Sequence, residues 1–426
     1  YLFAGTGDSA SQIFGDDGDE AIIKTGSYTG SGAVGKTITL GFEPQWMLIK
    51  NADNTTPWVM IDNMRGMPVN GEGVRVLADQ SAAEVSSASY FAPRADGVEV
   101  TLQNTYVNTS GETYIYMAIR RGPMKEPTAG TDVYKGVTGT NSAPAFVTGM
   151  PVDWAIRVKP TSPNTTSFQT TTRLINPRNL NVDDGSNGFT SDGGFDFQNG
   201  FLDSTNFNST WFAWNFRRFP KVFDHIAYKG TNGGGSASSY VDTHPHNLGV
   251  KPEMIIIRAT DNSAYSLNWE VWHTGLLGSI ANLADDSAAA NGLSDSATSD
   301  GVRFRDHSTA SVIGRTNSIH TNSTSHNYIG FLFASLSGIS AVNKYTGTGN
   351  DINVTDLGAA ARFVLIKRVD SSGSWYVYDS TRGIASGNDP YLLWDVTSAE
   401  VTNTDYIDPH SSGFTITSSA PAALNA

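Results

Sequence analysis

The apolar residues of this chain fall in short runs that are separated by polar turn residues. Three such runs, at 45–50, 254–258 and 363–367, are rich in branched and aromatic residues. Runs of this length and composition, bounded by Gly or Pro, are typical of strands that are covered on both faces. The Ser-, Thr-, Asn- and Gly-rich segments between the runs provide the tight turns of an antiparallel fold. The pattern therefore predicts an all-β chain with little helix.

The same pattern occurs four times along the chain. Each copy opens with a Tyr-x-Gly tripeptide, beginning at Tyr28, Tyr134, Tyr228 and Tyr345. Each opening is followed by an apolar run that ends in Ile and a cation: Ile49-Lys50, Ile156-Arg157, Ile257-Arg258 and Ile366-Lys367. The copies lie about 100 residues apart, which is the size of a small domain and longer than a solenoid repeat of about 20 to 50 residues. The chain is thus predicted to be a tandem array of modules.

Each module is predicted to be an antiparallel β-sandwich, because it contains several short strands with turns between them. The expected division is the end of a preceding module plus a linker at 1–27, repeats at 28–127, 128–226 and 227–341, and an incomplete repeat at 342–426. Four large side chains are expected at equivalent core positions of the four repeats: Trp46, Trp154, Met254 and Phe363.

The two ends of the sequence resemble parts of a copy. Copies one to three close on an aromatic strand, for example 328–334, whereas no such strand follows Phe414-Thr415-Ile416 in copy four. Tyr1-Leu2-Phe3-Ala4 is similar to Phe331-Leu332-Phe333-Ala334, at the end of a closing strand. Either the chain is a segment of a longer array, which we prefer, or its first strand completes the last module, in the same subunit or in a neighbouring one.

Composition argues against several classes of function. A net charge of −13 and a pI near 5.0 argue against binding to nucleic acid or to an anionic membrane surface, because phosphate neutralisation needs clustered Lys and Arg. No apolar stretch approaches the roughly 18 residues that cross a bilayer, so no membrane insertion is expected. The sequence has no Cys, so nothing in it depends on disulfides, thiolate metal sites or Cys nucleophiles.

A family resemblance is carried by three features of copy one. These are Tyr28-Thr29-Gly30, then Gly41-Phe42-Glu43-Pro44 before Leu48-Ile49-Lys50, then Trp58 with Asp62-Asn63-Met64-Arg65-Gly66. The pattern resembles modules of tail and other structural proteins of tailed bacteriophages, which are similar to concanavalin-like or laminin-G-like jelly rolls and occur in tandem. The match is good in copies one and four, partial in copy three and weak in copy two. The resemblance implies a virion structural role, with carbohydrate recognition as a further possibility.

An Asp and an Arg three residues apart, followed by Gly, form the sharpest local motif. It occurs as Asp62 with Arg65 and as Asp379 with Arg382. One interpretation is functional, with the carboxylate as a sugar or calcium ligand and the Arg as a clamp for an anionic sugar. The favoured interpretation is structural: the pair closes a strand end, and the Gly adopts a positive φ.

Other candidate sites are few. Four aromatic side chains are expected to be exposed at loop tips, where they could stack on glycan rings: Tyr90, Tyr106, Tyr391 and Trp394. The acidic segments 16–20 and 183–187 have the oxygen density of calcium loops but lack the spacing of an EF-hand. Solvated turns are favoured there, so no cofactor and no metal ligand is assigned.

No catalytic residue is assigned either, because the sequence lacks a paired-carboxylate strand motif, a nucleophile elbow, a phosphate-binding loop and a zinc-protease motif. The leading expectation is a non-enzymatic structural or assembly protein of a bacteriophage particle: a fibre, spike, collar or capsid decoration. Its partners would be other virion proteins, copies of itself or a cell-surface glycan. The alternatives are a glycan-binding module and a secreted or cell-surface bacterial adhesin or polysaccharide-active enzyme.

Overall fold

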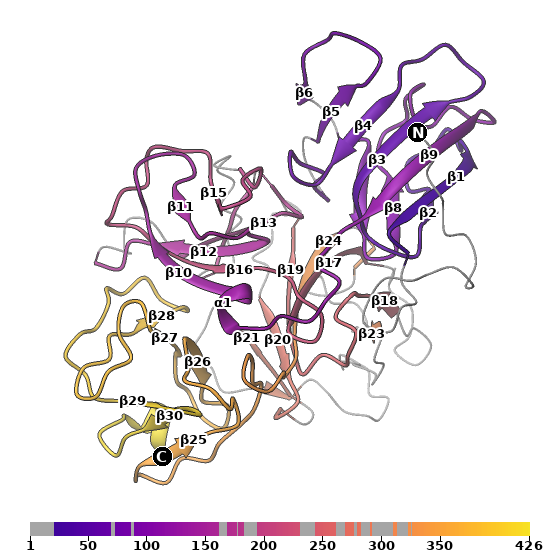
Figure 1. Ribbon diagram of the computed structural model, residues 1–426. Coiled ribbons are helices and arrows are strands. Elements are labelled where there is room, and N and C mark those ends of the chain that lie inside the picture. The colour runs from indigo at the N-terminus through magenta and orange to yellow at the C-terminus, as the bar shows by residue number, and fades with distance from the viewer. Residues whose placement is uncertain are drawn as a thin grey trace.

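Strands dominate the computed structural model (Figure 1). It describes residues 21–69, 73–86, 89–161, 168–176, 178–182, 194–230, 243–260, 269–276, 279–282, 290–291, 310–312, 323–324 and 326–426. Within these residues the two α-helices, α1 (Gly130–Val133) and α2 (Ala422–Asn425), have four residues each. The strand pairs run antiparallel. The prediction of an all-β chain is confirmed.

The sheets come in four pairs, which we call module 1 (23–120), module 2 (134–216), module 3 (223–333) and module 4 (340–426). In modules 1 to 3 one sheet has five or six strands and the other two or three. In module 4 both sheets have three strands, and we call the one that is equivalent to the other large sheets its large sheet. The large sheet of module 1 has the order β1 (Ile23–Thr29), β9 (Thr113–Arg120), β3 (Pro44–Asn51), β4 (Val59–Asp62), β5 (Val74–Leu77) and β6 (Val85–Ser86). Its small sheet has the order β2 (Thr37–Thr39), β8 (Gly97–Val100) and β7 (Phe91–Arg94).

Module 2 repeats this arrangement with shorter strands. Its large sheet has the order β10 (Tyr134–Thr138), β16 (Phe212–Phe216), β12 (Trp154–Val158), β13 (Gln169–Thr172) and β14 (Leu180–Asn181). Its small sheet consists of β11 (Phe146–Val147) and β15 (Gly200–Phe201).

Module 3 has the same order again. Its large sheet runs β17 (Phe223–Lys229), β24 (Asn327–Phe333), β19 (Met254–Ala259), β20 (Glu270–His273), β21 (Ser279–Asn282) and β22 (Ala290–Asn291). Its small sheet pairs β18 (Thr243–Pro245) with β23 (Ala310–Val312). The sequence pattern predicts that the first and third repeats begin at residues 28 and 227. Their first strands, β1 and β17, begin a few residues earlier, at Ile23 and Phe223.

Module 4 has the same plan, but within the described residues no strand takes the positions of β1, β9 and β6 in its large sheet. Its large sheet is β26 (Phe363–Lys367), β27 (Trp375–Asp379) and β28 (Leu392–Leu393). Its small sheet is β25 (Ile352–Val354), β30 (Gly413–Ile416) and β29 (Ile407–His410). Strand β26 corresponds to β3 of module 1, but β26 is an edge strand whereas β3 lies between β9 and β4.

The closing strands β9, β16 and β24 show which residues are equivalent. Trp46 pairs with Ile119, Trp154 with Phe216, and Met254 with Phe333. Each partner lies at or near the end of its closing strand, so the expected alignment of these three residues holds. Trp154 is only 2% exposed, whereas Trp46, Met254 and Phe363 are half-buried.

The Tyr-x-Gly alignment is wrong for copy two by three residues. The backbone N–H groups of Gly30, Gly139 and Gly230 make the same bond, to the carbonyl of the residue that directly precedes the closing strand. Gly139 is therefore the counterpart of Gly30, and Gly136 is not. A Cβ at Gly30 would lie 2.0 Å from the Thr109 carbonyl oxygen, and one at Gly139 2.4 Å from that of Phe207, so this close backbone approach requires glycine. Tyr134 instead starts β10, where its ring contacts Phe216 and Phe363.

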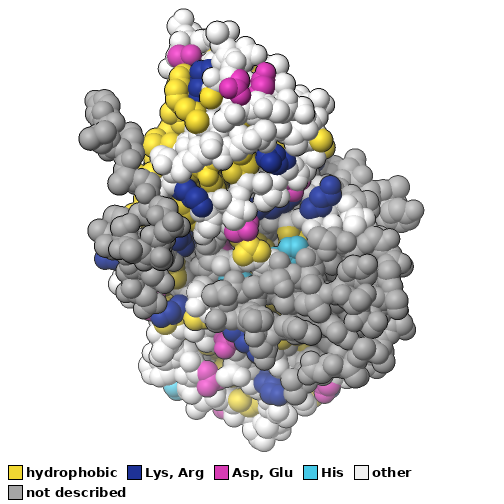
Figure 2. Space-filling model, turned by 90° about the vertical axis from the view of Figure 1, so that its right-hand side faces the viewer, with side chains coloured by type: hydrophobic (Ala, Val, Ile, Leu, Met, Phe, Trp, Pro, Cys, Tyr) yellow, Lys and Arg dark blue, Asp and Glu magenta, His cyan; other side chains and the backbone are white. Residues whose placement is uncertain are grey.

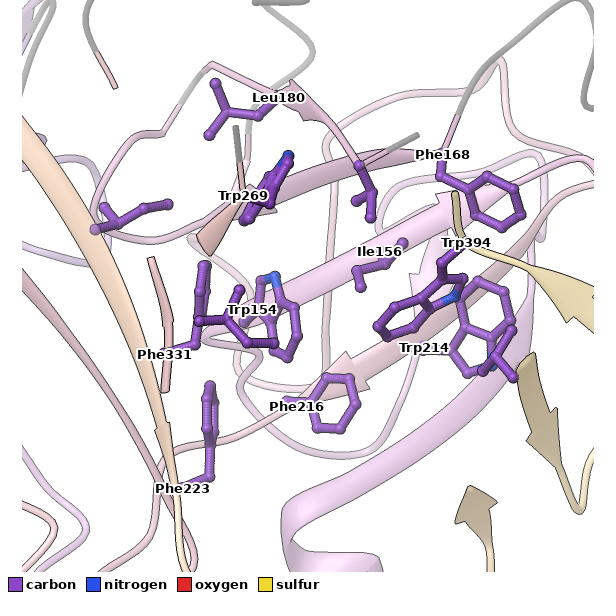
Figure 3. Close-up of a cluster of buried hydrophobic side chains, with 14 of the residues drawn as sticks. Trp154, Ile156, Phe168, Leu180, Trp214, Phe216, Phe223, Trp269, Phe331 and Trp394 are labelled. Atoms are coloured by element: carbon purple, nitrogen blue, oxygen red, sulfur yellow. The ribbon is translucent and has the colours of Figure 1, made fainter. Parts of the chain in front are cut away.

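Each module has its own apolar core between its two sheets. A further cluster, which we call the central cluster, lies on the opposite faces of the large sheets of modules 2, 3 and 4 (Figure 3). Module 2 supplies Trp154, Trp214 and Phe216, module 3 supplies Phe331, and module 4 supplies Trp394. These large sheets are covered on both faces, which explains why all five residues of β16 are buried.

Candidate functional site

The two Asp-Arg turns have nearly identical geometry. Arg65 donates from Nε to Asp62 Oδ2 at 2.7 Å, and Arg382 donates from Nε to Asp379 Oδ2 at 2.5 Å. In both turns Oδ1 of the Asp accepts hydrogen bonds from the two backbone N–H groups that follow at positions two and three. Gly66 and Gly383 then take φ values of +138° and +140°. This is the strand-closing turn that the spacing predicts.

A second carboxylate completes each turn. Arg65 Nη1 lies 3.3 Å from Glu84 Oε2, and Arg382 Nη1 lies 2.7 Å from Glu400 Oε1. The polar groups of both motifs are thus used within the fold. The turns differ in burial, because the Asp379 side chain is fully buried whereas that of Asp62 is 13% exposed.

The expectation of exposed aromatic side chains is wrong for three of the four residues. Tyr90, Tyr391 and Trp394 are only 3%, 9% and 1% exposed. The ring of Tyr90 is covered by Arg75 at 4.7 Å and meets the half-buried Tyr106 edge-on. These aromatic residues pack in cores because the segments that carry them are strands or directly flank strands, rather than loop tips.

Trp394 illustrates the reason most clearly. It follows β28 and lies in the central cluster, with its ring centroid 5.8 Å from those of Trp214 and Phe363. Tyr391 stacks on Tyr406 and tilts against Tyr376 inside module 4. None of these three rings presents a free face to a sugar.

A buried ionic network, which the sequence interpretation missed, joins modules 1, 2 and 3. Arg218, 1% exposed, donates two hydrogen bonds to Glu43, at 2.8 and 3.0 Å. Arg121 lies 3.4 Å from the same carboxylate and donates to Asp224 Oδ1 at 3.1 Å. Asp153 accepts from the backbone N–H of Arg218. Glu43 belongs to module 1, Asp153 to module 2 and Asp224 to module 3, so one set of charges ties the three together.

Arg173 adds a further contact to this network. It donates from Nε to Asp153 Oδ1 at 3.2 Å and from Nη1 to the Phe195 carbonyl at 2.6 Å. Three cations therefore face three carboxylates, which is the condition under which buried charges are tolerated.

A repeated sequence signal marks this network. An acid precedes the third strand of modules 1 to 3, as Glu43, Asp153 and Glu253, and Arg follows the closing strand as Arg121 and Arg218. In module 3 the acid plays the same local role, since Glu253 Oε2 accepts from the Ser335 backbone at 2.7 Å. In modules 1 to 3 the acid thus pairs with one of the first two residues after the closing strand.

Burial and the neighbouring cations shift the pKa values of two groups at the network. Although burial alone would raise the pKa of the Asp153 carboxyl, Arg218, Arg173 and Arg121 hold it below its ordinary value. Burial and the same three cations hold the pKa of His225 well below its usual value, so this imidazole is neutral. Each of the three cations pairs with at least one carboxylate of the network.

A groove lies where module 4 meets modules 2 and 3. Its volume is about 640 Å³, and it runs between residues 338–347 and strand β26. Apolar side chains of three modules line it, including Trp154, Phe216, Met254 and Leu365. Such a volume is within the range of about 300 to 1,000 Å³ that ligand sites have.

Within the described ranges, no group of three or more His, Asp or Glu side chains is arranged to hold a metal ion. The acidic segments 16–20 and 183–187 lie outside these ranges. No helix in the described part of the chain is both long enough and apolar enough to cross a membrane.

Fold and contacts together define an all-β protein of paired antiparallel sheets with buried links between the pairs. The chain belongs to the family described as Domain of unknown function (DUF7483), whose model matches residues 20–123 and 221–426. The matched residues include modules 1, 3 and 4, while module 2 falls between the two ranges. Comparison with curated proteins and with solved structures gave no match.

Proposed function

We propose that this protein is a non-enzymatic structural or assembly component of a bacteriophage particle. The observation that carries the proposal is the way in which the modules are joined. Modules within one chain are by default mobile, with modest and polar interfaces. Here the central cluster and the ionic network bury large aromatic and charged side chains between modules. A stiff, repetitive body of this kind suits a load-bearing part of a particle.

The order of the contacts supports the same role. Trp269 Nε1 of module 3 donates to the Asn181 carbonyl of module 2 at 2.8 Å, and Val69 of module 1 donates to the Leu174 carbonyl of module 2 at 2.7 Å. Module 2 therefore contacts both of its neighbours in sequence, and it also meets module 4 through the central cluster (Figure 1). The kind of particle is inferred from the sequence, because copies one and four resemble modules of phage structural proteins.

Carbohydrate binding is the second candidate for these modules and rests on the resemblance. The four aromatic residues expected to carry it are buried or half-buried, so a glycan site would have to use other residues. A secreted adhesin or a polysaccharide-active enzyme is the alternative outside the particle.

The test is to locate the protein. Gold-labelled antibodies against residues 21–426 are applied to purified phage particles and to the surface of uninfected cells from the same source. The proposal expects regular labelling at one place on the particle. Label on the cell surface or in the culture medium, with none on particles, would support the adhesin or enzyme instead. A glycan array with the same protein detects sugar binding in either location.

A further inference from the structure

The groove beside β26 occupies the place of a closing strand. In module 1, the closing strand β9 lies between β1 and β3 and pairs with both. In module 4, the counterpart of β3 is β26, and residues 340–346 precede Gly347 as β1 precedes Gly30. These are the two walls of the groove.

Side-chain contacts prove the equivalence at one end of the groove. Tyr28 donates from its hydroxyl to the Val107 carbonyl at 2.7 Å, and Tyr345 donates to the Leu424 carbonyl at 2.7 Å. The next residues also match: Asn108 Oδ1 accepts from the Ser31 N–H at 2.8 Å, and Asn425 Oδ1 accepts from the Thr348 N–H at 3.0 Å.

The equivalence extends to the turn that leads into the closing strand. A Cβ at Gly30 would lie 2.0 Å from Thr109, and a Cβ at Gly347 would lie 2.4 Å from Ala426. In module 1 the chain enters β9 four residues after Thr109, at Thr113. Module 4 is thus built as module 1 is, up to the point at which β9 begins.

The walls of the groove have two apolar faces, as a strand with alternating side chains requires. Val364 and Ile366 join the core of module 4, while Phe363 and Leu365 pack against the central cluster. Their counterparts in module 1, where β9 pairs with β3, are Met47 and Ile49, and both are fully buried. Val364 and Ile366 remain 6% and 7% exposed.

We propose that this groove binds an extended polypeptide strand of the repeat's own closing type, supplied from outside residues 21–426. The strand lies antiparallel to β26, and its backbone pairs with the open edge of that strand. By the registers of β9 and β24, residues opposite Val364 and Ile366 enter the core of module 4. Residues opposite Phe363 and Leu365 reach the central cluster, as Phe333 and Phe331 do opposite Met254 and Ile256 in module 3. This inference does not depend on the proposed function.

The occupant is a peptide strand rather than a small apolar molecule, because the groove combines an apolar lining with an edge strand. An edge presents a row of N–H and C=O groups that a strand satisfies and an apolar molecule does not. The closing strands 113–120 and 327–333 show the sequence character of such a strand, although each is already paired in its own module. Outside residues 21–426, Tyr1-Leu2-Phe3-Ala4 has the sequence character of the second.

A synthetic peptide with the sequence of residues 113–120 tests the proposal, with a scrambled peptide of the same composition as control. The intact 426-residue protein is titrated with each fluorescently labelled peptide, and amide hydrogen exchange is recorded with and without peptide. The proposal expects the 113–120 peptide to bind at least about tenfold more tightly than the scrambled one. It also expects slower exchange in 340–346 and 363–368.

An Ile366→Asp variant should lose peptide binding, and a Ser371→Asp variant on the exposed loop after β26 should keep it. Equal binding of the two peptides, or protection confined to other segments, would overturn the proposal. An apolar dye bound in the groove provides a further control: its displacement to the same extent by both peptides would also overturn the proposal. The hydrogen-exchange result on the unmodified protein decides the matter even if the Ile366→Asp variant does not fold.

Discussion

The indole Nε1 of Trp214 donates a hydrogen bond to Asp379 Oδ2, at 3.0 Å, across the boundary between modules 2 and 4. Both residues are fully buried. Asp379 is also the carboxylate of the second Asp-Arg turn. The same side chain therefore stabilises that turn and links module 4 to module 2. The guanidinium of Arg382 lies 5.3 Å from the centre of the Trp214 ring and strengthens the same contact.

An Asp379→Asn variant should therefore be much less stable than an Asp62→Asn variant. The first leaves the largely buried Arg382 with Glu400 as its one remaining carboxylate and also removes the charged acceptor of the Trp214 hydrogen bond, at a cost of about 3 kcal/mol. The second affects a partly exposed pair and should cost about 1 kcal/mol or less. Urea denaturation of both variants measures the difference. Equal losses of stability would show that the Trp214 link contributes little.

Substitution of the aligned Trp154 and Trp46 should distinguish a sheet face that is covered by the central cluster from one that is not. Trp154→Ala removes a ring stacked within 4.7 Å of Phe216 and 4.5 Å from Phe331, and should cost about 3 to 5 kcal/mol. Trp46→Ala, at the equivalent but half-buried position, should cost clearly less. Thermal unfolding of the two variants provides the comparison, and a larger loss for Trp46→Ala would contradict the central cluster.

The ionic network should control the attachment of module 1. Glu43→Gln leaves Arg218 buried with a neutral partner, so we expect a loss of about 3 to 5 kcal/mol. Trypsin should then cut faster at Lys125, in the exposed segment after module 1. Asp370→Asn, which removes the exposed partner of Arg368, is the control and should change neither property. An unchanged cleavage rate for Glu43→Gln would refute the attachment role.

Stability should fall between pH 7 and pH 5 because of His225. Its pKa is held well below the usual value in the folded protein, so only the unfolded chain takes up this proton as the pH falls below about 6.5. At this residue the unfolded state then binds one more proton, so His225 alone lowers the free energy of unfolding by about 1.4 kcal/mol per pH unit. Burial also lowers the pKa values of His246 and His273, which act in the same direction, whereas Asp389, whose pKa burial raises to about 6, acts in the opposite direction. Above pH 7 the contribution is constant. Asp153, whose pKa is also lowered, acts only at more acidic pH.

Urea denaturation of the wild-type protein and of His225→Phe, from pH 8 to pH 5, tests this assignment. Phe fits because the imidazole already lies among Phe223 and Phe331. The variant should show a shallower pH dependence below pH 6.5. Identical slopes would assign the acid sensitivity to other groups.

The strands, the repeat and the strand-closing turns could be predicted from sequence, because each depends on neighbours a few residues away. Ile49-Lys50 and its three counterparts show a strand from composition alone, and Asp62 with Arg65 shows a turn from spacing alone. Contacts between modules could not be predicted in this way. Nothing local distinguishes Trp394, which is buried between modules, from an aromatic residue at a loop tip.

The alignment of copy two failed for a related reason. The Tyr of the Tyr-x-Gly signature packs within its own module in copies one and three, where Tyr28 and Tyr228 stack on Tyr114 and Tyr328. Tyr134 packs between modules instead, and Val137 takes the local position. The glycine that the backbone requires was the better guide to register.

The central claim is that the four modules form one stiff body, and a distance between modules 1 and 4 tests it most directly. Because the chain has no Cys, spin labels can be placed at Ser110→Cys and Ser386→Cys, two exposed positions. Pulsed electron spin resonance then records the distribution of distances between the labels. A single narrow distribution that broadens in the Glu43→Gln variant is the predicted result. A broad distribution in the otherwise unaltered protein would show loosely strung modules and contradict the account.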